Sequence, residues 1–108
     1  MKPLIPFEHV IILIPAKNEV NTVGKVISEI KARFIVTVVV IDDASTDETT
    51  NVARVAGAIV LQLPFSLGAW GAIQTGLRYA LKHGFNIAIT MDADGQHEVS
   101  SIDDIDTV

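Results

Sequence analysis

The chain has 108 residues, of which 49% are hydrophobic and 19% are charged, so its composition is that of one globular domain and excludes a disordered segment. The formal net charge is -5 and Lys and Arg form no cluster, which excludes a nucleic-acid partner held through phosphate contacts. The absence of cysteine excludes disulfides, zinc–thiolate sites and cysteine nucleophiles. An acidic domain of this kind can still bind phosphates through a metal ion, backbone amides or a few local cations.

The apolar runs are too short for a membrane-spanning helix. The longest, residues 10–16 and 35–41, fall far below the roughly 20 residues that such a helix needs. The first six residues are too short and too rich in proline for a signal peptide. We therefore expect no membrane span in this chain. The default location is the cytoplasm, or the cytoplasmic face of a membrane if other segments or partners bring the chain there.

The chain opens with a strand and a helix. Residues 10–14 form a continuous apolar run, rich in β-branched side chains and closed by Pro15, which predicts a buried strand. Apolar residues then recur at helical spacing over residues 23–30. Asn18 or Asn21 is available to cap this helix.

A second strand–helix pair follows, and then a third strand. Residues 36–41 predict another buried strand, which ends in two aspartates. Ser45 with Glu48 three residues later has the spacing of a capping box, which predicts the start of a helix that Gly57 ends. Residues 58–62 then predict a short strand closed by a proline.

The longest predicted helix ends near His83 and Gly84, and a fourth strand follows over residues 87–91. Within this helix Trp70 belongs to the apolar stripe, so we expect it to pack in the core. A final weak helix is expected to begin at Ser100 or Ser101. The stripe consists of Leu67, Trp70, Ile73, Leu77 and Leu81.

Strands that alternate with helices and are apolar throughout predict an α/β fold with a doubly wound, mostly parallel sheet of about four strands. In such sheets ligands bind beyond the carboxyl ends of the strands, where the strand order reverses. Three of the four predicted strand ends carry distinctive polar residues, at 15–19, 42–47 and 92–97. Since parallel strands bring these ends to one edge, the three loops together predict a ligand site.

The last of these loops suggests a metal site. Asp92 and Asp94 follow a predicted strand one residue apart, so their side chains point the same way if the extended backbone continues. Two carboxylates side by side are hard oxygen ligands that suit Mg²⁺ or Mn²⁺. Such a pair is common by chance, and its weight comes from the agreement of all three loops.

The chain resembles the inverting family 2 glycosyltransferases of the GT-A fold, which include the dolichyl-phosphate mannose synthases. The resemblance covers nearly the whole chain from Val10 onward. It implies one nucleotide-sugar-binding domain over residues 1–108, which lacks the acceptor-binding half and its catalytic base, so no catalytic residue is assigned. The residues that carry it are Ile14–Glu19, Val40–Thr49, Gly71–Leu77 and Met91–His97.

The resemblance also implies the partners and the contacts of the site. The donor is a UDP- or GDP-sugar, and Mg²⁺ or Mn²⁺ bridges its diphosphate. Of the acidic pair after the second strand, Asp43 is favoured for the base contact and Asp42 for holding the loop. The implied nucleotide-binding residues are Pro15, Ala16, Glu19, Asp42, Asp43, Gly71 and Asp92, and the implied metal ligands are Asp92 and Asp94, with Gln96 as an accessory.

Other functions are weaker alternatives. A receiver-like signalling domain that binds Mg²⁺ needs an acidic pair after the first strand, where this chain has Pro15 and Ala16. A dinucleotide-binding oxidoreductase needs a Gly-x-Gly-x-x-Gly loop after a strand, and no predicted strand of this chain is followed by one. The chain could also be a catalytically inactive nucleotide-binding or assembly module. Its fourth strand would then be an exposed apolar edge, which predicts self-association.

Overall fold

The computed structural model describes residues 5–94, which form one parallel four-stranded sheet with helices on both faces. Each predicted strand and helix within this range is present, although the bounds differ by a few residues. The elements in chain order are β1 (Ile5–Ala16), α1 (Val23–Lys31), β2 (Phe34–Asp42), α2 (Thr49–Val55), β3 (Ile59–Gln62), α3 (Gly68–Lys82) and β4 (Ile87–Thr90). The helix expected near Ser100 lies outside the described residues.

The strand order is β3-β2-β1-β4, and all neighbouring strands are parallel. The chain moves from β1 through β2 to β3 on one side, and then crosses back to place β4 on the other side of β1. The order therefore reverses between β1 and β4, which is where doubly wound sheets bind ligands. The predicted fold class is confirmed.

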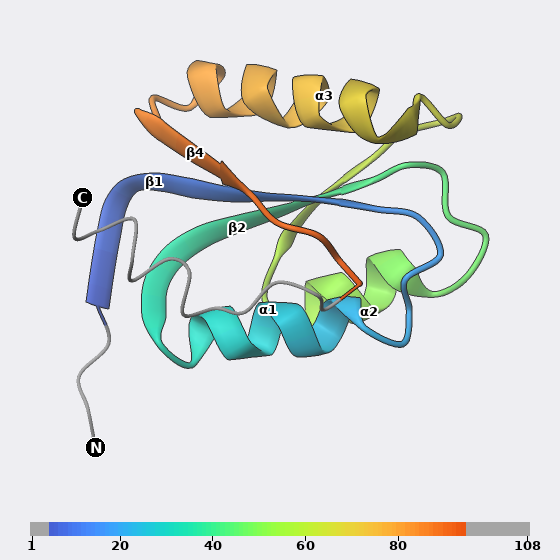
Figure 1. Cartoon of the computed structure of the whole chain (residues 1–108), viewed down its shortest axis with the longest axis horizontal. Helices are drawn as coiled ribbons and strands as arrows, with labels where there is room; N and C mark the ends of the chain where they lie inside the picture. The colour runs from blue at the N-terminus through green and yellow to red at the C-terminus, as the bar shows by residue number, and fades with distance from the viewer. Residues whose placement is uncertain (1–4, 95–108) are drawn as a thin grey trace.

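Two cores lie on opposite faces of the sheet, one toward α1 and α2 and the other toward α3. Figure 1 shows these helices on the two sides of the sheet. Alternate residues of β1 serve them, because side chains of a strand point to opposite faces. Ile12 and Ile14 pack in the core under α1 and α2, and Ile11 and Leu13 pack in the core under α3. All four side chains are fully buried, which explains why residues 10–14 of the strand are apolar at every position. The face predicted for α1 is confirmed, since Val23, Val26, Ile27 and Ile30 are buried.

The predicted apolar face of α3 is wrong. The helix buries its small residues, Ala72, Gly76 and Ala80, against the sheet. A Cβ atom on Gly76 would lie 2.9 Å from Ile41 Cδ1 and 3.1 Å from Leu13 Cδ1, so the helix is packed too closely for larger side chains there. Trp70 is therefore 67% exposed, and Leu77 and Leu81 also reach solvent. The core role expected for Trp70 is corrected accordingly.

The predicted helix caps, Asn18 or Asn21 for α1 and Ser45 for α2, are also wrong, whereas the start of α1 at Val23 and the ends of α2 and α3 are confirmed. The N-cap residue of α1 is Thr22, and that of α2 is Glu48, three residues later than the Ser45 capping box implies. Neither cap residue uses its side chain to accept a hydrogen bond from a backbone amide of its own helix. Gly57 and Gly84 follow the ends of α2 and α3 with φ of 103° and 79°, a conformation that glycine adopts readily. No helix among residues 5–94 combines the length and the apolar character needed to cross a membrane.

Candidate functional site

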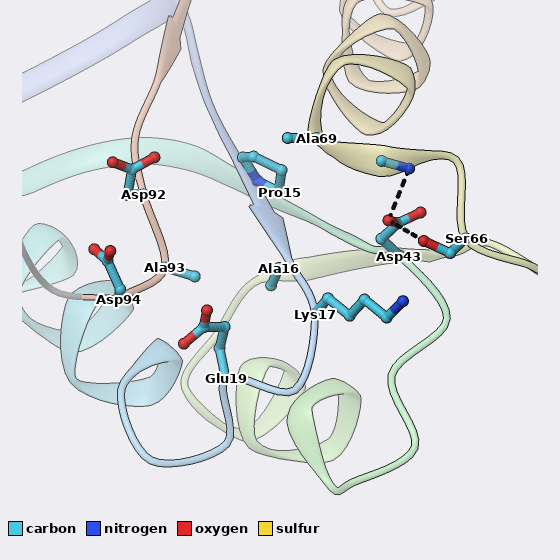
Figure 2. A pocket seen from close by; sticks show the side chains of 11 residues that line it. Pro15, Ala16, Lys17, Glu19, Asp43, Ser66, Ala69, Asp92, Ala93 and Asp94 are labelled. Carbon is cyan, nitrogen blue, oxygen red and sulfur yellow. Dashed lines mark hydrogen bonds between the residues drawn. The ribbon is translucent and has the colours of Figure 1, made fainter.

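A cavity of about 510 Å³ lies at the carboxyl edge of the sheet, beside the point where the strand order reverses (Figure 2). The end of β1, the loops after β1, β2 and β4 and the start of α3 line it, so the three predicted strand-end loops meet here. Figure 2 shows side chains from β1 between those of the β4 loop and those of the α3 side. The lining residues are Pro15, Ala16, Lys17, Glu19, Asp43, Ser66, Gly68, Ala69, Asp92, Ala93 and Asp94.

Asp43 connects the end of β2 to the start of α3. Its carboxylate accepts hydrogen bonds from the Leu67 amide at 2.6 Å, the Ser66 hydroxyl at 2.7 Å and the Gly68 amide at 3.0 Å. Burial alone would raise the pKa of Asp43, but these bonds and the charge of Lys17 lower it below its ordinary value. The residue is thus held as a carboxylate at the cavity wall.

Asp42 faces the other way, into the loop that follows β2. Its carboxylate accepts hydrogen bonds from the amide of Ser45 at 2.9 Å and from the hydroxyl of Thr50. Asp42 is buried and does not line the cavity. These are the contacts of a residue that holds the loop, and a contact of Asp42 with a nucleotide stays a prediction.

The loops after β1 and β2 are joined by reciprocal hydrogen bonds. The amide of Asn18 donates to Ser45 Oγ at 2.8 Å, and Asn18 Oδ1 accepts from the amide of Thr46 at 2.8 Å. Asn18 has a φ of 53°, a left-handed conformation that asparagine tolerates better than most residues. The next amide, that of Glu19, donates to Thr49 Oγ1 at 2.9 Å. These bonds fix the loop that carries Lys17 and Glu19 to the cavity.

Asp92 and Asp94 are exposed at the cavity, and Ala93 between them is buried with 3% of its surface accessible. Figure 2 shows both carboxylates on the side of the cavity opposite Asp43. Among residues 5–94 no group of three or more His, Cys, Asp or Glu side chains could hold a metal ion. Mg²⁺ typically uses one or two carboxylates together with substrate phosphates, so the two aspartates fit an ion shared with a phosphorylated ligand.

The structure brings most of the predicted site residues together. Pro15, Ala16 and Glu19 line the same cavity as Asp43, Asp92 and Asp94. Gly71 does not. It lines a separate hollow on α3 with Trp70, where a Cβ atom would lie 2.6 Å from Leu67 Cβ. Gly76 packs closely against the strands, whereas the atoms nearest to Gly71 are those of Leu67. Gln96 lies outside the described residues.

Sequence reasoning missed several residues of this site. Ser66, Gly68 and Ala69 line the cavity at the start of α3, and no periodic pattern distinguishes them. The local signal was the run of small residues at the start of that helix, next to the predicted Gly71. Thr22 was also missed: its hydroxyl donates to the carbonyl of Ala93 at 2.6 Å and so contacts the Asp92–Asp94 loop.

The sequence profile of glycosyl transferase family 2 matches residues 11–105, which is most of the chain and contains every loop of the cavity. The chain belongs to glycosyl transferase family 2. The family predicted from the strand-end motifs is therefore confirmed.

Curated relatives in this family are longer than the chain, which spans about two-fifths of the two described here. An uncharacterized protein of Methanocaldococcus jannaschii is 34% identical over 98 residues, covering 91% of this chain and 40% of that protein. An undecaprenyl-phosphate mannosyltransferase of Micrococcus luteus is 32% identical over 96 residues, covering 83% of this chain and 40% of the enzyme.

Solved structures show the same GT-A fold. A glucosyl-3-phosphoglycerate synthase from Mycobacterium tuberculosis, in complex with Mg²⁺ and uridine diphosphate, superimposes with a TM-score of 0.65 at 28% identity. The match covers 78% of this chain and 32% of that one. A metal ion and uridine diphosphate thus occur together in a solved structure that shares this fold.

Proposed function

We propose that this family 2 domain binds a UDP- or GDP-sugar together with Mg²⁺ or Mn²⁺ and presents the sugar for transfer to an acceptor. One observation carries the proposal: Asp43 and the Asp92–Asp94 pair line a single cavity at the switch point of the sheet. A base-sized group at Asp43 and a diphosphate at the aspartate pair would occupy opposite sides of that cavity. Inactive nucleotide binding is the alternative outcome.

The aspartate pair would hold the metal ion in this proposal. When bound, the ion would act as a Lewis acid that stabilises the negative charge on the departing diphosphate. Asp92 and Asp94 would ligate it with carboxylate oxygens, and Gln96 is proposed as an accessory ligand. Glu19 lines the same cavity and would lie along the nucleoside with Pro15.

Asp43 would recognise the base. A carboxylate has about four acceptor positions, and hydrogen bonds from Ser66, Leu67 and Gly68 use three of them. The remaining position can accept an N–H from the edge of uracil or guanine. A charged acceptor makes a stronger bond than a neutral one, and Asp43 is held ionised at its place in the cavity.

Titration calorimetry with UDP and with GDP, each with and without Mn²⁺, tests this function. We expect metal-dependent binding of one of the two nucleotides, and at least tenfold weaker binding for Asp94→Ala. Glu29→Ala, which removes an exposed carboxylate on α1, is the matched control and should bind like the original chain. Equal affinities with and without Mn²⁺, or an unaffected Asp94→Ala variant, would refute the metal site.

We propose in addition that the chain self-associates through β4. Within the described residues β4 pairs with β1 alone, so its outer edge has unsatisfied backbone groups. Ile87 is 51% exposed, and Ala88 and Thr90 are exposed on the α3 side, because α3 lies mainly over β1 and β2. Leu81, which is 79% exposed on α3, adds apolar surface.

Sedimentation velocity at tens of micromolar tests the self-association. We expect a concentration-dependent dimer that Ala88→Lys abolishes, because a charge at the sheet edge opposes strand pairing. Val55→Lys is the control, since Val55 is 89% exposed on α2, on the opposite face of the sheet from α3. A strictly monomeric profile would contradict the proposal. The cytoplasmic location stays a prediction.

A further inference from the structure

The hydroxyl of Thr22, at the start of α1, contacts the loop that carries Asp92 and Asp94. Thr22 is the N-cap residue of α1, where a threonine hydroxyl usually accepts a hydrogen bond from an amide of its own helix. Here the hydroxyl makes no such bond. It lies near three acceptors: the carbonyl of Ala93, 71 positions later, at 2.6 Å, Oε2 of Glu19 at 3.2 Å and the carbonyl of Glu19 at 3.5 Å. The hydroxyl has one proton, and the contact with Ala93 is the shortest of the three. A carbonyl cannot donate, so the proton of this short contact belongs to Thr22.

The backbone of Thr22 is fixed on both sides. Its amide donates to the Glu19 carbonyl at 3.1 Å, and its carbonyl accepts from the amide of Val26 at 3.1 Å. The residue is half-buried, so its side chain leaves a rigid helix start from a defined position. Thr22 can therefore serve as a fixed anchor for whatever its hydroxyl holds.

The loop at the other end of this bond begins where the chain leaves β4. The last strand-type bond after β4 is that from the Met91 amide to the Leu13 carbonyl, at 3.0 Å. Ala93 follows two residues later, with its methyl group in the core shared with α1 and its carbonyl on Thr22. The side chain and the carbonyl of Ala93 are thus both held.

Fixing this carbonyl fixes the direction of the chain between the two aspartates. The carbonyl of Ala93 and the N–Cα bond of Asp94 lie in one planar peptide unit. Rotation of that unit would turn Asp94 away from Asp92, which precedes it by two residues. The bond from Thr22 opposes this rotation, because the carbonyl would lose its donor.

We infer that Thr22 is a positioning residue, whose hydroxyl sets the relative orientation of Asp92 and Asp94 and thereby the affinity of the site for a divalent cation. The inference rests on the proposed metal site, although the hold on the loop itself does not. Removing a group that does not bind the metal itself but orients a metal ligand typically lowers the affinity for the metal 10- to 100-fold. Thr22 does not line the cavity and acts on the two aspartates through the Ala93 peptide. Its hydroxyl also lies 3.2 Å from Oε2 of Glu19, so the measurement that isolates the hold on the loop is one made on residues 91–94 themselves.

Two variants separate the hydroxyl from the shape of the side chain. Thr22→Val keeps the shape and removes the donor, and Thr22→Ser keeps the donor. Thr75→Val is the matched control, since Thr75 Oγ1 also donates to a backbone carbonyl, that of Gly71 at 3.0 Å, outside the cavity. The first measurement is amide hydrogen exchange in the metal-free chain. We expect faster exchange in peptides that cover residues 91–94 for Thr22→Val only.

The second measurement is Mn²⁺ binding in the presence of UDP or GDP, followed by electron paramagnetic resonance. We expect about tenfold weaker Mn²⁺ binding for Thr22→Val, with Thr22→Ser and Thr75→Val close to the original chain. Weaker binding in Thr22→Ser as well would assign the effect to packing and overturn the inference. Unchanged exchange and affinity in Thr22→Val would also overturn it. If the original chain binds no Mn²⁺, the proposed function fails, and the exchange result alone decides whether Thr22 holds the loop.

Discussion

The carboxylate of Asp43 accepts a hydrogen bond of 2.6 Å from the amide of Leu67, 24 residues later in the chain. Leu67 is the N-cap residue of α3 and has no side chain that can cap the helix. Asp43 supplies this cap from the end of β2, and its negative charge also suits the positive end of the helix. One residue of the cavity wall thus also fixes the helix that lines the cavity.

Replacing Asp43 with Asn should destabilise the domain by about 1–3 kcal/mol at neutral pH, since bonds to a charged acceptor are weakened or lost. The folded-state pKa of Asp43 is lowered, so its contribution is full above the unfolded-state pKa of about 3.9 and is lost as the pH falls through the folded-state pKa. The difference between the two proteins should therefore close below about pH 4. Urea unfolding at several pH values measures it, and a difference that persists at the lowest pH would contradict the assignment.

Asn18→Ala should destabilise the domain by about 1–3 kcal/mol, because it removes the acceptor of the Thr46 amide and places alanine in a left-handed conformation. Asn18→Gly should cost less, since glycine adopts this φ without strain. The exposed Asn21, replaced with Ala, is the control and should change stability by less than about 0.5 kcal/mol. Thermal unfolding of the three variants ranks them, and equal losses in Asn18→Gly and Asn18→Ala would argue against backbone strain.

Gly76→Val should destabilise the domain by about 1–3 kcal/mol, because side chains of Leu13 and Ile41 already fill the space beside Gly76. Gln74→Val is the control, because it places valine at an exposed position of the same helix, where the side chain meets no clash. Chemical denaturation of both variants separates packing from propensity. A loss at Gln74→Val as large as that at Gly76→Val would rule out close packing as the cause.

Trp70 is the one tryptophan of the sequence, so its fluorescence reports directly on its surroundings. With 67% of its surface accessible, it should emit like an indole in water and be quenched readily by acrylamide in dilute protein. Trp70→Ser should change stability by no more than about 0.5 kcal/mol. By contrast, Phe34→Ala, at a residue 1% exposed, should cost about 3–5 kcal/mol. A blue-shifted, protected emission at low concentration would show that Trp70 is covered.

The sequence by itself determined the parallel α/β fold and the positions of the strands, because a strand buried on both faces must be apolar throughout. The ends of α2 and α3 could also be predicted from local sequence, since Gly57 and Gly84 supply a backbone conformation that few other residues adopt. The strand-end motifs predicted the family and placed Asp43, Asp92 and Asp94 at one edge of the sheet.

Only the tertiary structure decided which face of α3 is buried. Leu77 and Ala80 both belong to stripes with helical spacing, and the close approach to β1 and β2 admits only the stripe of small residues. The helix caps were decided in the same way, because the polar side chains near them, those of Ser45 and Thr22, bond to other loops. Asp43 caps α3 across 24 residues, and Thr22 holds Ala93 across 71. No local pattern records such partners, since folding alone brings them within hydrogen-bonding distance.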